Sequence, residues 1–458
     1  MNDYLIYSVS IAVAVISFYF FRATSGSMAF SRLNLMSVAY YYHFLLISFV
    51  GGVIIVTGGG DNSVIHKLSD SARMLGWVAI CYALLVFPVG AYLAKRIVLG
   101  RKAVSVVYNE FLESPVTPIL SRKDSCVRLP LLIISLICFF SALYMLWVTK
   151  KIPQLELLNF SGYSDLLLFR NSINRDFGGI YYIKSIVFEQ LTPLLSLVAY
   201  SYYSVTKSKL DRLWFYFMLL LSLNALTFSL AKSPLFAYAI TFVILRIYLY
   251  GGIPVKRLAV LFLILSAGLF FVFYFVMQND LSNAVFYLIS RIFVDQISGM
   301  FLMFEIFPDN YDFIGIGSLS KPLSSVVLGE YSPSARRIAM LYAFAERAES
   351  GEMNLLSTLF IGEAWANFGW IGFILSPLYM GFILGVFYYM VIKTRKNPIT
   401  CGFLAYYTFS VGLSSQFNVY IYNPVFMAVL FVFAASFVFS VEIRKVLLYE
   451  KSRHLNAE

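Results

Sequence analysis

The chain has 458 residues, of which 60% are hydrophobic and 13% charged, with a mean hydropathy of +0.77. Soluble domains carry about 25% charged residues, so this composition excludes an ordinary soluble enzyme and predicts an all-α polytopic membrane protein. The formal net charge of +11 is assigned to loops that set membrane orientation, so we expect no nucleic-acid partner.

Apolar runs long enough to cross a bilayer predict about eleven transmembrane helices, within a range of about 10 to 13. The first run lacks a basic leader and a small-residue cleavage site, so it is interpreted as a retained span. The predicted spans form one integral membrane domain over residues 1–458 and lie near residues 4–20, 33–57, 75–94, 129–148, 185–204, 213–230, 233–250, 258–277, 369–391, 399–416 and 424–442.

The loops between the spans alternate in charge. The strongly basic ones, such as "AKRIVLGRK" (94–102) and "KTRKNP" (393–398), are predicted to be cytoplasmic by the positive-inside rule. Two long segments then face the periplasm, residues 149–184 and 278–368, and both contain amphipathic stretches. Their unusual polar residues favour an active site at the outer membrane face over a transport path within the spans.

The positive-inside rule disfavours cations in these outer segments. We therefore expect that they bind an anionic ligand. Planar arginine donors suit phosphate oxygens, and a lysine adds a point charge. The alternative for each is a side chain that only reaches toward lipid headgroups. The candidates in the two outer segments are Arg170, Arg175, Arg291, Arg336 and Arg337, and a sixth, Lys232, lies in a very short outer turn between two spans. Four other charges are interpreted as ordinary surface residues: Lys150, Lys151, Lys184 and Arg347.

The segment "GEAWANFGW" closes the second outer segment and contains Glu363. On a helix, Glu363, Asn367 and Trp370 are spaced to share one face. Glu363 is the candidate catalytic base, and its alternative role is a structural hydrogen bond to a neighbouring helix end. Asp309 and Asp312 lie in a turn-rich stretch. With three histidines and no CxxC pair, we expect neither a metal nor a cofactor.

The order of these segments resembles that of the Wzy-type O-antigen or oligosaccharide repeat-unit polymerases. The resemblance is carried by "FRNSINRDFGGIYYIKSIVFEQLTPLL", "FPDNYDFIGIGSL" and "NLLSTLFIGEAWANFGWIGF". It covers residues 130–392 in order and topology, whereas the N-terminal third matches only in hydropathy.

The resemblance implies a GT-C-type glycosyltransferase of the bacterial inner membrane with a periplasmic active site. Its substrate would be an oligosaccharide carried on undecaprenyl pyrophosphate, and its other partners would be membrane lipid and a chain-length regulator (polysaccharide co-polymerase). Matched residue by residue, it implies an anion-binding role for Arg170, Arg175, Lys232 and Arg291. Glu363 and Asn367 match the last motif, and the Arg336–Arg337 pair matches more loosely.

Three alternatives remain open at this stage. O-antigen ligases share the architecture but use a histidine in the second outer segment, and this chain has none between His66 and His454. A peptidoglycan-type polymerase would show a different loop pattern. A lipid-linked oligosaccharide flippase would line a cavity with cations from within its spans.

Overall fold

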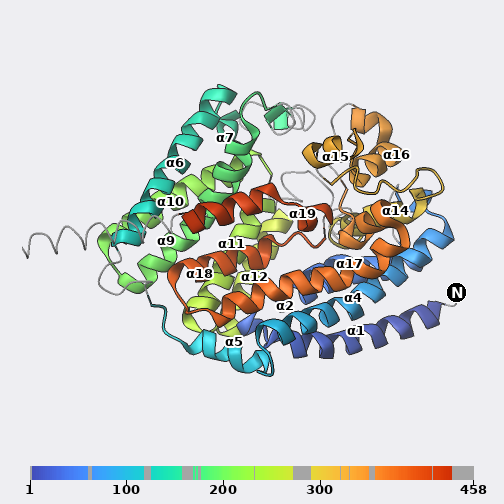
Figure 1. Ribbon diagram of the computed structural model, residues 1–458, viewed down its shortest axis with the longest axis horizontal. Helices are drawn as coiled ribbons and strands as arrows, with labels where there is room; N and C mark the ends of the chain where they lie inside the picture. The colour runs from blue at the N-terminus through green and yellow to red at the C-terminus, as the bar shows by residue number, and fades with distance from the viewer. Residues whose placement is uncertain are drawn as a thin grey trace, which may run out of the picture. The chain divides into compact units, whose positions relative to one another are not determined.

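The computed structural model describes residues 3–59, 64–117, 125–156, 169–170, 172–173, 177–231, 233–271, 290–319, 321–329, 331–349, 356–414 and 416–435 (Figure 1). Every regular element in these ranges is helical, which confirms an all-α protein. Seven helical stretches there are long and apolar enough to cross a membrane: Asp3–Arg32, Leu35–Val56, Asp70–Val98, Arg128–Thr149, Ser233–Tyr250, Leu359–Lys393 and Asn418–Ala435.

The other four predicted spans also fall on helices, but these do not meet the same criterion over the described residues. The predicted count of eleven therefore stays a prediction. These helices are α9 (Thr192–Thr206), α10 (Lys209–Phe228), α12 (Val255–Phe271) and α18 (Pro398–Ser410).

The chain divides into two compact units. The first consists of residues 1–113, 250–394 and 408–422, and the second of residues 114–249, 395–407 and 423–458. Besides α12, the helices of the first unit are α1 (Asp3–Ser25), η1 (Phe30–Arg32), α2 (Leu35–Val38), η2 (Ala39–Phe49), α3 (Val50–Val56), η3 (Ile65–Lys67), α4 (Asp70–Val98), α5 (Val104–Glu113), η6 (Ser290–Val294), α14 (Asp295–Ile306), α15 (Lys321–Leu328), α16 (Ala335–Glu349), α17 (Leu359–Lys393) and α19 (Asn418–Ile421). The second unit contains α6 (Ser125–Thr149), α7 (Pro153–Glu156), η4 (Ile183–Leu191), α9, α10, α11 (Ser233–Tyr250) and most of α18.

Helices α4 and α17 form the central pair of the first unit and lie side by side in Figure 1. They approach so closely that a Cβ atom on Gly381 would lie 1.9 Å from the carbonyl oxygen of Phe87. A Cβ atom on Gly90 would likewise lie 2.0 Å from the carbonyl oxygen of Leu378. Small residues that let two backbones meet are typical of helix packing in membranes, where apolar burial alone gives little driving force.

The side chains of α17 satisfy the carbonyl groups that end two neighbouring helices. Tyr388 and Tyr389 donate to the carbonyls of Ser25 and Thr24 at the end of α1. Lys393 donates to the carbonyl of Val98 at the end of α4, at 2.9 Å. Because helix ends leave carbonyls without intrahelical partners, these bonds stabilise the ends. They also show that α1, α4 and α17 run parallel, as the predicted topology requires.

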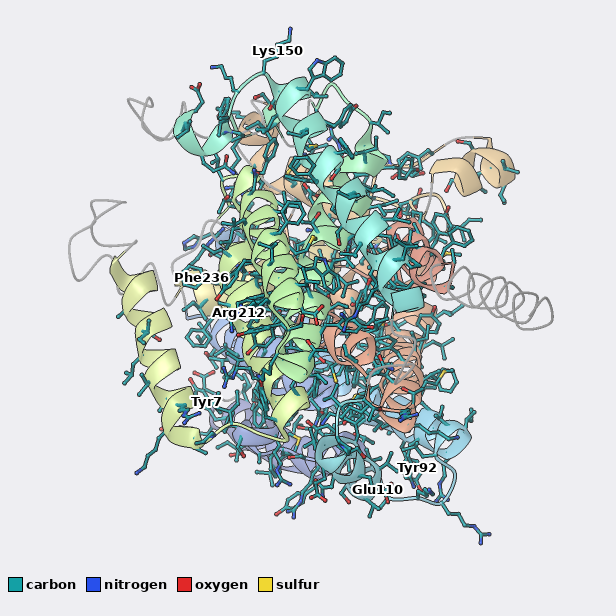
Figure 2. All side chains as sticks on the ribbon, turned by 90° about the vertical axis from the view of Figure 1, so that its left-hand side faces the viewer. Tyr7, Tyr92, Glu110, Lys150, Arg212 and Phe236 are labelled. Atoms are coloured by element: carbon teal, nitrogen blue, oxygen red, sulfur yellow. The ribbon has the colours of Figure 1, made fainter. Side chains whose placement is uncertain are left out.

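The end of the unit where these three helices finish is also where the basic loop 94–102 lies. Figure 2 shows Tyr92 of α4 and Glu110 of α5 at that same end. There Arg96 donates from Nε to the Tyr92 hydroxyl at 2.9 Å. Cations in the last turn of α4 complement the negative end of its dipole, so they favour the helix besides setting its orientation in the membrane.

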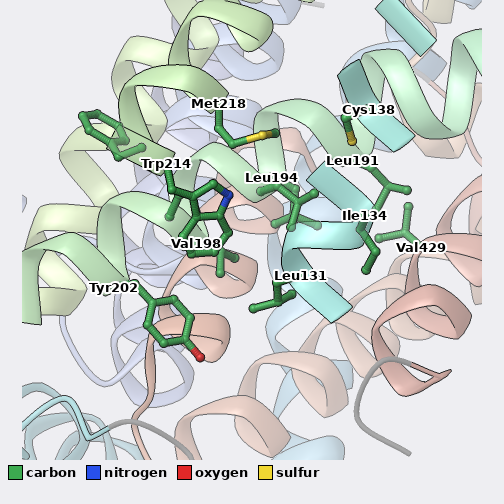
Figure 3. Packing of buried hydrophobic residues seen from close by; sticks show 13 residues of the cluster. Leu131, Ile134, Cys138, Leu191, Leu194, Val198, Tyr202, Trp214, Met218 and Val429 are labelled. Carbon is green, nitrogen blue, oxygen red and sulfur yellow. The ribbon is translucent and has the colours of Figure 1, made fainter. Parts of the chain in front are cut away.

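The core of the second unit joins α6, η4, α9 and α10. Its buried residues come from all four of these helices, and Trp214 donates from its indole nitrogen to Ser135 at 3.0 Å. This bond matters because a buried indole N–H without a partner is costly. The cluster in Figure 3 consists of Leu131, Ile134, Cys138, Leu191, Leu194, Leu195, Val198, Ala199, Tyr202, Trp214, Phe215, Met218 and Val429.

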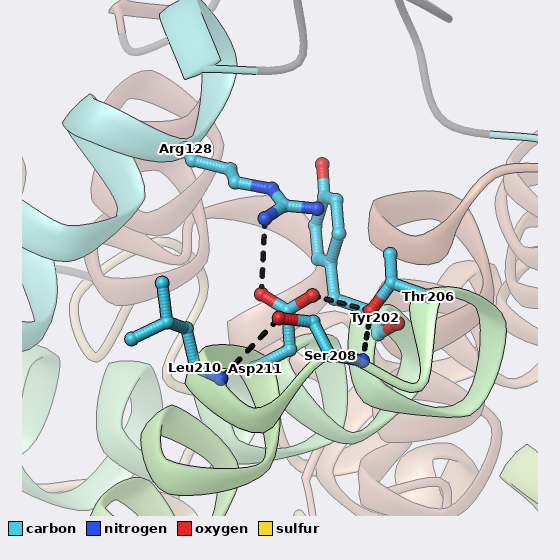
Figure 4. Close-up of polar contacts among 6 residues, drawn as sticks. All are labelled: Arg128, Tyr202, Thr206, Ser208, Leu210 and Asp211. Atoms are coloured by element: carbon cyan, nitrogen blue, oxygen red, sulfur yellow. Dashed lines mark hydrogen bonds and ion pairs between the residues drawn. The ribbon is translucent and has the colours of Figure 1, made fainter.

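A buried carboxylate fixes the ends of α6, α9 and α10 to one another (Figure 4). Asp211, with 4% of its side chain exposed, forms an ion pair with Arg128 at 3.2 Å. The Thr206 hydroxyl, at the end of α9, donates to the other oxygen of the same carboxylate. The Arg128 guanidinium also lies over the ring of Tyr202. One carboxylate thus joins three helix ends.

Replacing Asp211 with alanine is expected to destabilise the second unit by about 1–3 kcal/mol, because Arg128 and Thr206 both lose their partner. The loss should appear as a melting temperature several degrees lower in detergent. Asp211→Asn keeps an acceptor for Thr206, so its loss should be smaller. Equal melting temperatures for the parental and Asp211→Ala proteins would contradict this role.

Candidate functional site

The first nine residues of α17 form a helical segment enclosed by protein. Residues 359–367 are all buried, whereas the sequence suggested the edge of a membrane span. A helix that is buried on every side must find partners for its polar side chains within the protein. Glu363 and Asn367 are each 1% exposed, so their contacts decide what this segment does.

Helix α17 is broken at Gly369, whose φ of 59° and ψ of −137° lie outside the helical region. Such a φ favours glycine, and a Cβ atom there would also lie 3.0 Å from the ring of Phe313. The break frees the carbonyls of Ala366 and Asn367, which accept from the N–H groups of Ile314 and Gly315 at 3.1 and 2.8 Å. The turn-rich stretch of the second outer segment is thereby joined to α17.

The break also corrects one expectation from the sequence. Glu363 and Asn367 share a buried face as predicted, but Trp370 does not join them and is 59% exposed. The helical spacing fails because Gly369 redirects the chain between Asn367 and Trp370. Trp365 points elsewhere, as expected, and its indole nitrogen donates to the carbonyl of Phe307 at 3.0 Å.

The carboxylate of Glu363 lies at the start of α19. Its Oε2 atom accepts from the backbone N–H of Asn418 at 3.0 Å and from the N–H of Phe417. Two backbone N–H groups that donate to the same oxygen stabilise a carboxylate. The other oxygen, Oε1, makes no hydrogen bond within the described part of the chain. One oxygen is therefore fixed while the second is left for another partner.

Arg336 of α16 is directed into the same region. Its Nε atom donates to the carbonyl of Leu356 at 2.7 Å, and its NH1 atom donates to Oε1 of Gln416 at 3.3 Å. Burial lowers the pKa of the Arg336 guanidinium, while the negative charge of Glu363 opposes this change. The two opposite charges thus both contact residues 416–418.

Asn367 takes part in a closed ring of buried amide and hydroxyl groups. Its Nδ2 atom donates to Oδ1 of Asn418 at 2.7 Å, and its Oδ1 atom accepts from the hydroxyl of Ser318 at 3.2 Å. Asn418 closes the ring by donating from Nδ2 to the carbonyl and hydroxyl oxygens of Ser318, both at 3.2 Å. The ring joins α17, the loop before α15 and the start of α19.

The sequence does not single out Ser318, Gln416 or Asn418. The available signal was the polar run "SSQFN" (414–418), which overlaps the end of the predicted span 399–416. Nothing in a single sequence shows that this run folds back onto Glu363. The contact is between residues more than fifty positions apart.

The structure describes four of the six predicted cations, and their surroundings differ. Arg291 is exposed and forms an ion pair with Asp295, one helical turn away, at 3.2 Å. Arg337 is exposed, and Arg170 is half-buried in the second unit. Arg175 and Lys232 lie outside the described residues. Convergence of these cations on one ligand therefore stays a prediction.

Lys184 is not the ordinary surface charge that the sequence suggested. It is only 4% exposed, and its ammonium donates to the carbonyl of Ile173 at 2.9 Å and lies 4.0 Å from the carboxylate of Glu189. It also lies over the ring of Phe177. A buried lysine needs such partners, and here they join η4 to the first outer segment.

Comparisons of the sequence with models of known families, with curated proteins and with solved structures give no match. The roles of the candidate site residues are therefore inferred from the resemblance in motif order and from the contacts that these residues make.

Proposed function

We propose that this protein is a polymerase that joins undecaprenyl-pyrophosphate-linked oligosaccharide repeat units at the periplasmic face of the bacterial inner membrane. Its product is O-antigen or a related surface polysaccharide. The observation that carries the proposal is the buried carboxylate of Glu363, with Oε2 held by two N–H groups and Oε1 without a partner in the described residues. The apolar helices and the order of motifs over residues 130–392 support it further.

In this reaction, a hydroxyl at the non-reducing end of a new repeat unit attacks the anomeric carbon of the growing chain. A carbon–oxygen bond forms, and the bond between that carbon and the phosphate oxygen breaks. Undecaprenyl pyrophosphate leaves with the electron pair, and the hydroxyl proton passes to Oε1 of Glu363. A positioned base contributes roughly a hundredfold to ten-thousandfold.

Oε1 has to meet a sugar hydroxyl, yet Glu363 is only 1% exposed. One of the surrounding segments must therefore move when substrate binds. The candidate is the second outer segment apart from residues 314–318, which hydrogen bonds hold to α17 and α19. Closing a site around its substrate excludes water and strengthens the electrostatic interactions inside.

The leaving pyrophosphate gains negative charge, and fixed cations stabilise such charge, with one well-placed donor worth roughly 3–4 kcal/mol. We assign this role to Arg170, Arg175, Lys232 and Arg291, with Arg337 as a further contact. Arg291 suits it because its pairing with Asp295 is exposed. Exposed ion pairs contribute little to stability, so the guanidinium can exchange the carboxylate for a phosphate.

Replacing Arg291 with alanine is expected to lower polymer yield at least tenfold, because the pyrophosphate loses a bidentate donor. Arg291→Lys should not restore the yield, since an ammonium cannot reproduce the planar pair of donors. The exposed Arg257, which precedes a predicted span on the cytoplasmic side, provides the control, and its alanine variant should polymerise normally. Normal polymer length and yield from Arg291→Ala would show that Arg291 does not bind the pyrophosphate.

The proposal is tested by adding the purified protein to a lipid-linked repeat unit in proteoliposomes and separating the products by size. A polymerase yields a ladder whose steps equal one repeat unit. A flippase instead moves the lipid-linked unit across the bilayer without changing its length. Transfer to the other leaflet with no ladder would favour the flippase.

A further inference from the structure

Residues 413–414 and 416–418, a polar segment before and at the start of α19, are held against the start of α17 by hydrogen bonds in both directions. The N–H groups of Leu359 and Phe360 donate to the carbonyls of Ser414 and Leu413 at 2.9 and 3.0 Å. In return, the N–H groups of Phe417 and Asn418 donate to Glu363. The first N–H groups of a helix have no intrahelical acceptor. The N–H groups at the start of α17 and those at the start of α19 each find an acceptor in the other segment.

The side chains of this segment add contacts that depend on residue type. Gln416 accepts from Arg336, and Asn418 is held by Ser318 and Asn367 in the closed amide ring. Asn418 is 7% exposed and Ser318 4% exposed, so water does not replace these bonds easily. The position of the Asn418 N–H, and with it that of Glu363 Oε2, is therefore set by two side chains from elsewhere in the unit.

We propose that residues 413–414 and 416–418 form the positioning segment for Glu363, and that Asn418 and Ser318 are positioning residues of the reaction. Asn418 acts through its backbone N–H, which fixes Oε2 and so sets the direction in which Oε1 meets the acceptor hydroxyl. Ser318 acts one step further away by fixing the amide of Asn418. This inference rests on the proposed function and adds residues to its site.

The physical reason is that proton transfer requires the donor and acceptor atoms within hydrogen-bond reach. A displacement of about 1 Å costs about a hundredfold in rate. A carboxylate attached through a flexible side chain does not keep such a position unless one of its oxygens is held. Substrate binding depends on other contacts and is not expected to change.

The test measures kcat and KM for Ser318→Ala and Asn418→Ala in the polymer-ladder assay. We expect kcat to fall about tenfold for Ser318→Ala, which removes only a hydroxyl, and about a hundredfold for Asn418→Ala. KM for the lipid-linked unit should stay within about twofold. Unchanged kcat in both variants would overturn the inference.

Two controls separate positioning from general loss of stability. Asn34 is also buried, and its side chain caps α2 in the same unit. Asn34→Ala should therefore lower the melting temperature without changing kcat per folded molecule. Ser376 is a buried serine of α17 whose hydroxyl makes no hydrogen bond to the residues that the structure describes, so Ser376→Ala should change neither quantity. A fall in kcat in step with melting temperature across all four variants would overturn the inference.

A double-mutant cycle tests whether Ser318 acts through Glu363. In the Glu363→Asp background the carboxylate is one methylene shorter and no longer rests on the Asn418 N–H. Adding Ser318→Ala should then change the remaining rate by less than about twofold. A full tenfold effect in both backgrounds would show that Ser318 acts elsewhere and would overturn the inference.

Hydrogen exchange gives a readout that does not depend on activity. The amides of Phe417 and Asn418 should exchange slowly in the parental protein and at least tenfold faster in Glu363→Ala. If the parental protein makes no polymer, the proposed function fails, while slow exchange still supports the hydrogen-bonded geometry. If polymer forms but exchange is equally fast in both proteins, only the positioning inference fails.

Discussion

Replacing Glu363 with glutamine is expected to abolish the polymer ladder while leaving the fold and the binding of the lipid-linked donor intact. In the parental protein the N–H groups of Phe417 and Asn418 donate to Oε2 of Glu363. The side-chain carbonyl oxygen of glutamine can accept the same two hydrogen bonds. An amide does not accept a proton at neutral pH, so the reaction loses its base and at least a hundredfold in rate. The measurement is polymer yield per folded protein.

Glu363→Asp is the matched variant, because it keeps the carboxylate but shortens its reach. We expect a reduced but measurable ladder from Glu363→Asp and none from Glu363→Gln. Donor binding is followed separately, as the rise in melting temperature when the lipid-linked repeat unit is added. Polymerisation by Glu363→Gln at the parental rate would make Glu363 a structural hydrogen-bonding residue and place the base elsewhere.

Replacing Gly381 with alanine is expected to prevent the close packing of α4 and α17. The added Cβ atom would lie 1.9 Å from the carbonyl oxygen of Phe87, and a backbone atom cannot turn away as a side chain can. We expect a loss at or above about 3 kcal/mol, the upper end of the usual range for overpacked cores. It should appear as a sharp drop in monodisperse protein and in melting temperature after extraction in detergent.

Gly268 of α12 provides the control for this substitution. It lies in a helix of the same unit, and a Cβ atom there would meet nothing within 4 Å. Gly268→Ala should therefore be neutral or slightly stabilising, since alanine favours a helix over glycine. Equal yields and melting temperatures for the two variants would show that the contact between α4 and α17 relaxes without cost.

Much of the helical architecture follows from the sequence because hydrophobic length is a local property. The apolar runs of α1, α4 and α17 each mark a helix. The basic loops after α4 and α17, residues 94–102 and 393–398, predict that these two helices run parallel, and the alternation of spans gives α1 the same direction. The hydrogen bonds of Tyr388, Tyr389 and Lys393 to the ends of α1 and α4 agree with that direction. Which glycines bring two helices into contact is not local, so Gly90 and Gly381 could not be singled out.

The candidate site was predictable only in part. Helical spacing correctly places Glu363 and Asn367 on one face, because both precede the break at Gly369. The same spacing fails for Trp370, since a single glycine with positive φ redirects the chain. The partners of Glu363 are residues 417 and 418, at the end of a short polar run between two apolar helices. Only the fold shows that the backbone of this run, and not its side chains, meets the carboxylate.

The most direct test of the central claim measures undecaprenyl pyrophosphate release and polymer growth in the same proteoliposomes. The mechanism requires one molecule of undecaprenyl pyrophosphate for each repeat unit joined, because the bond to the leaving phosphate breaks as the new glycosidic bond forms. We expect this one-to-one ratio from the parental protein and neither product from Glu363→Gln. Release without polymer growth, or equal amounts of both products from the two proteins, would contradict the account.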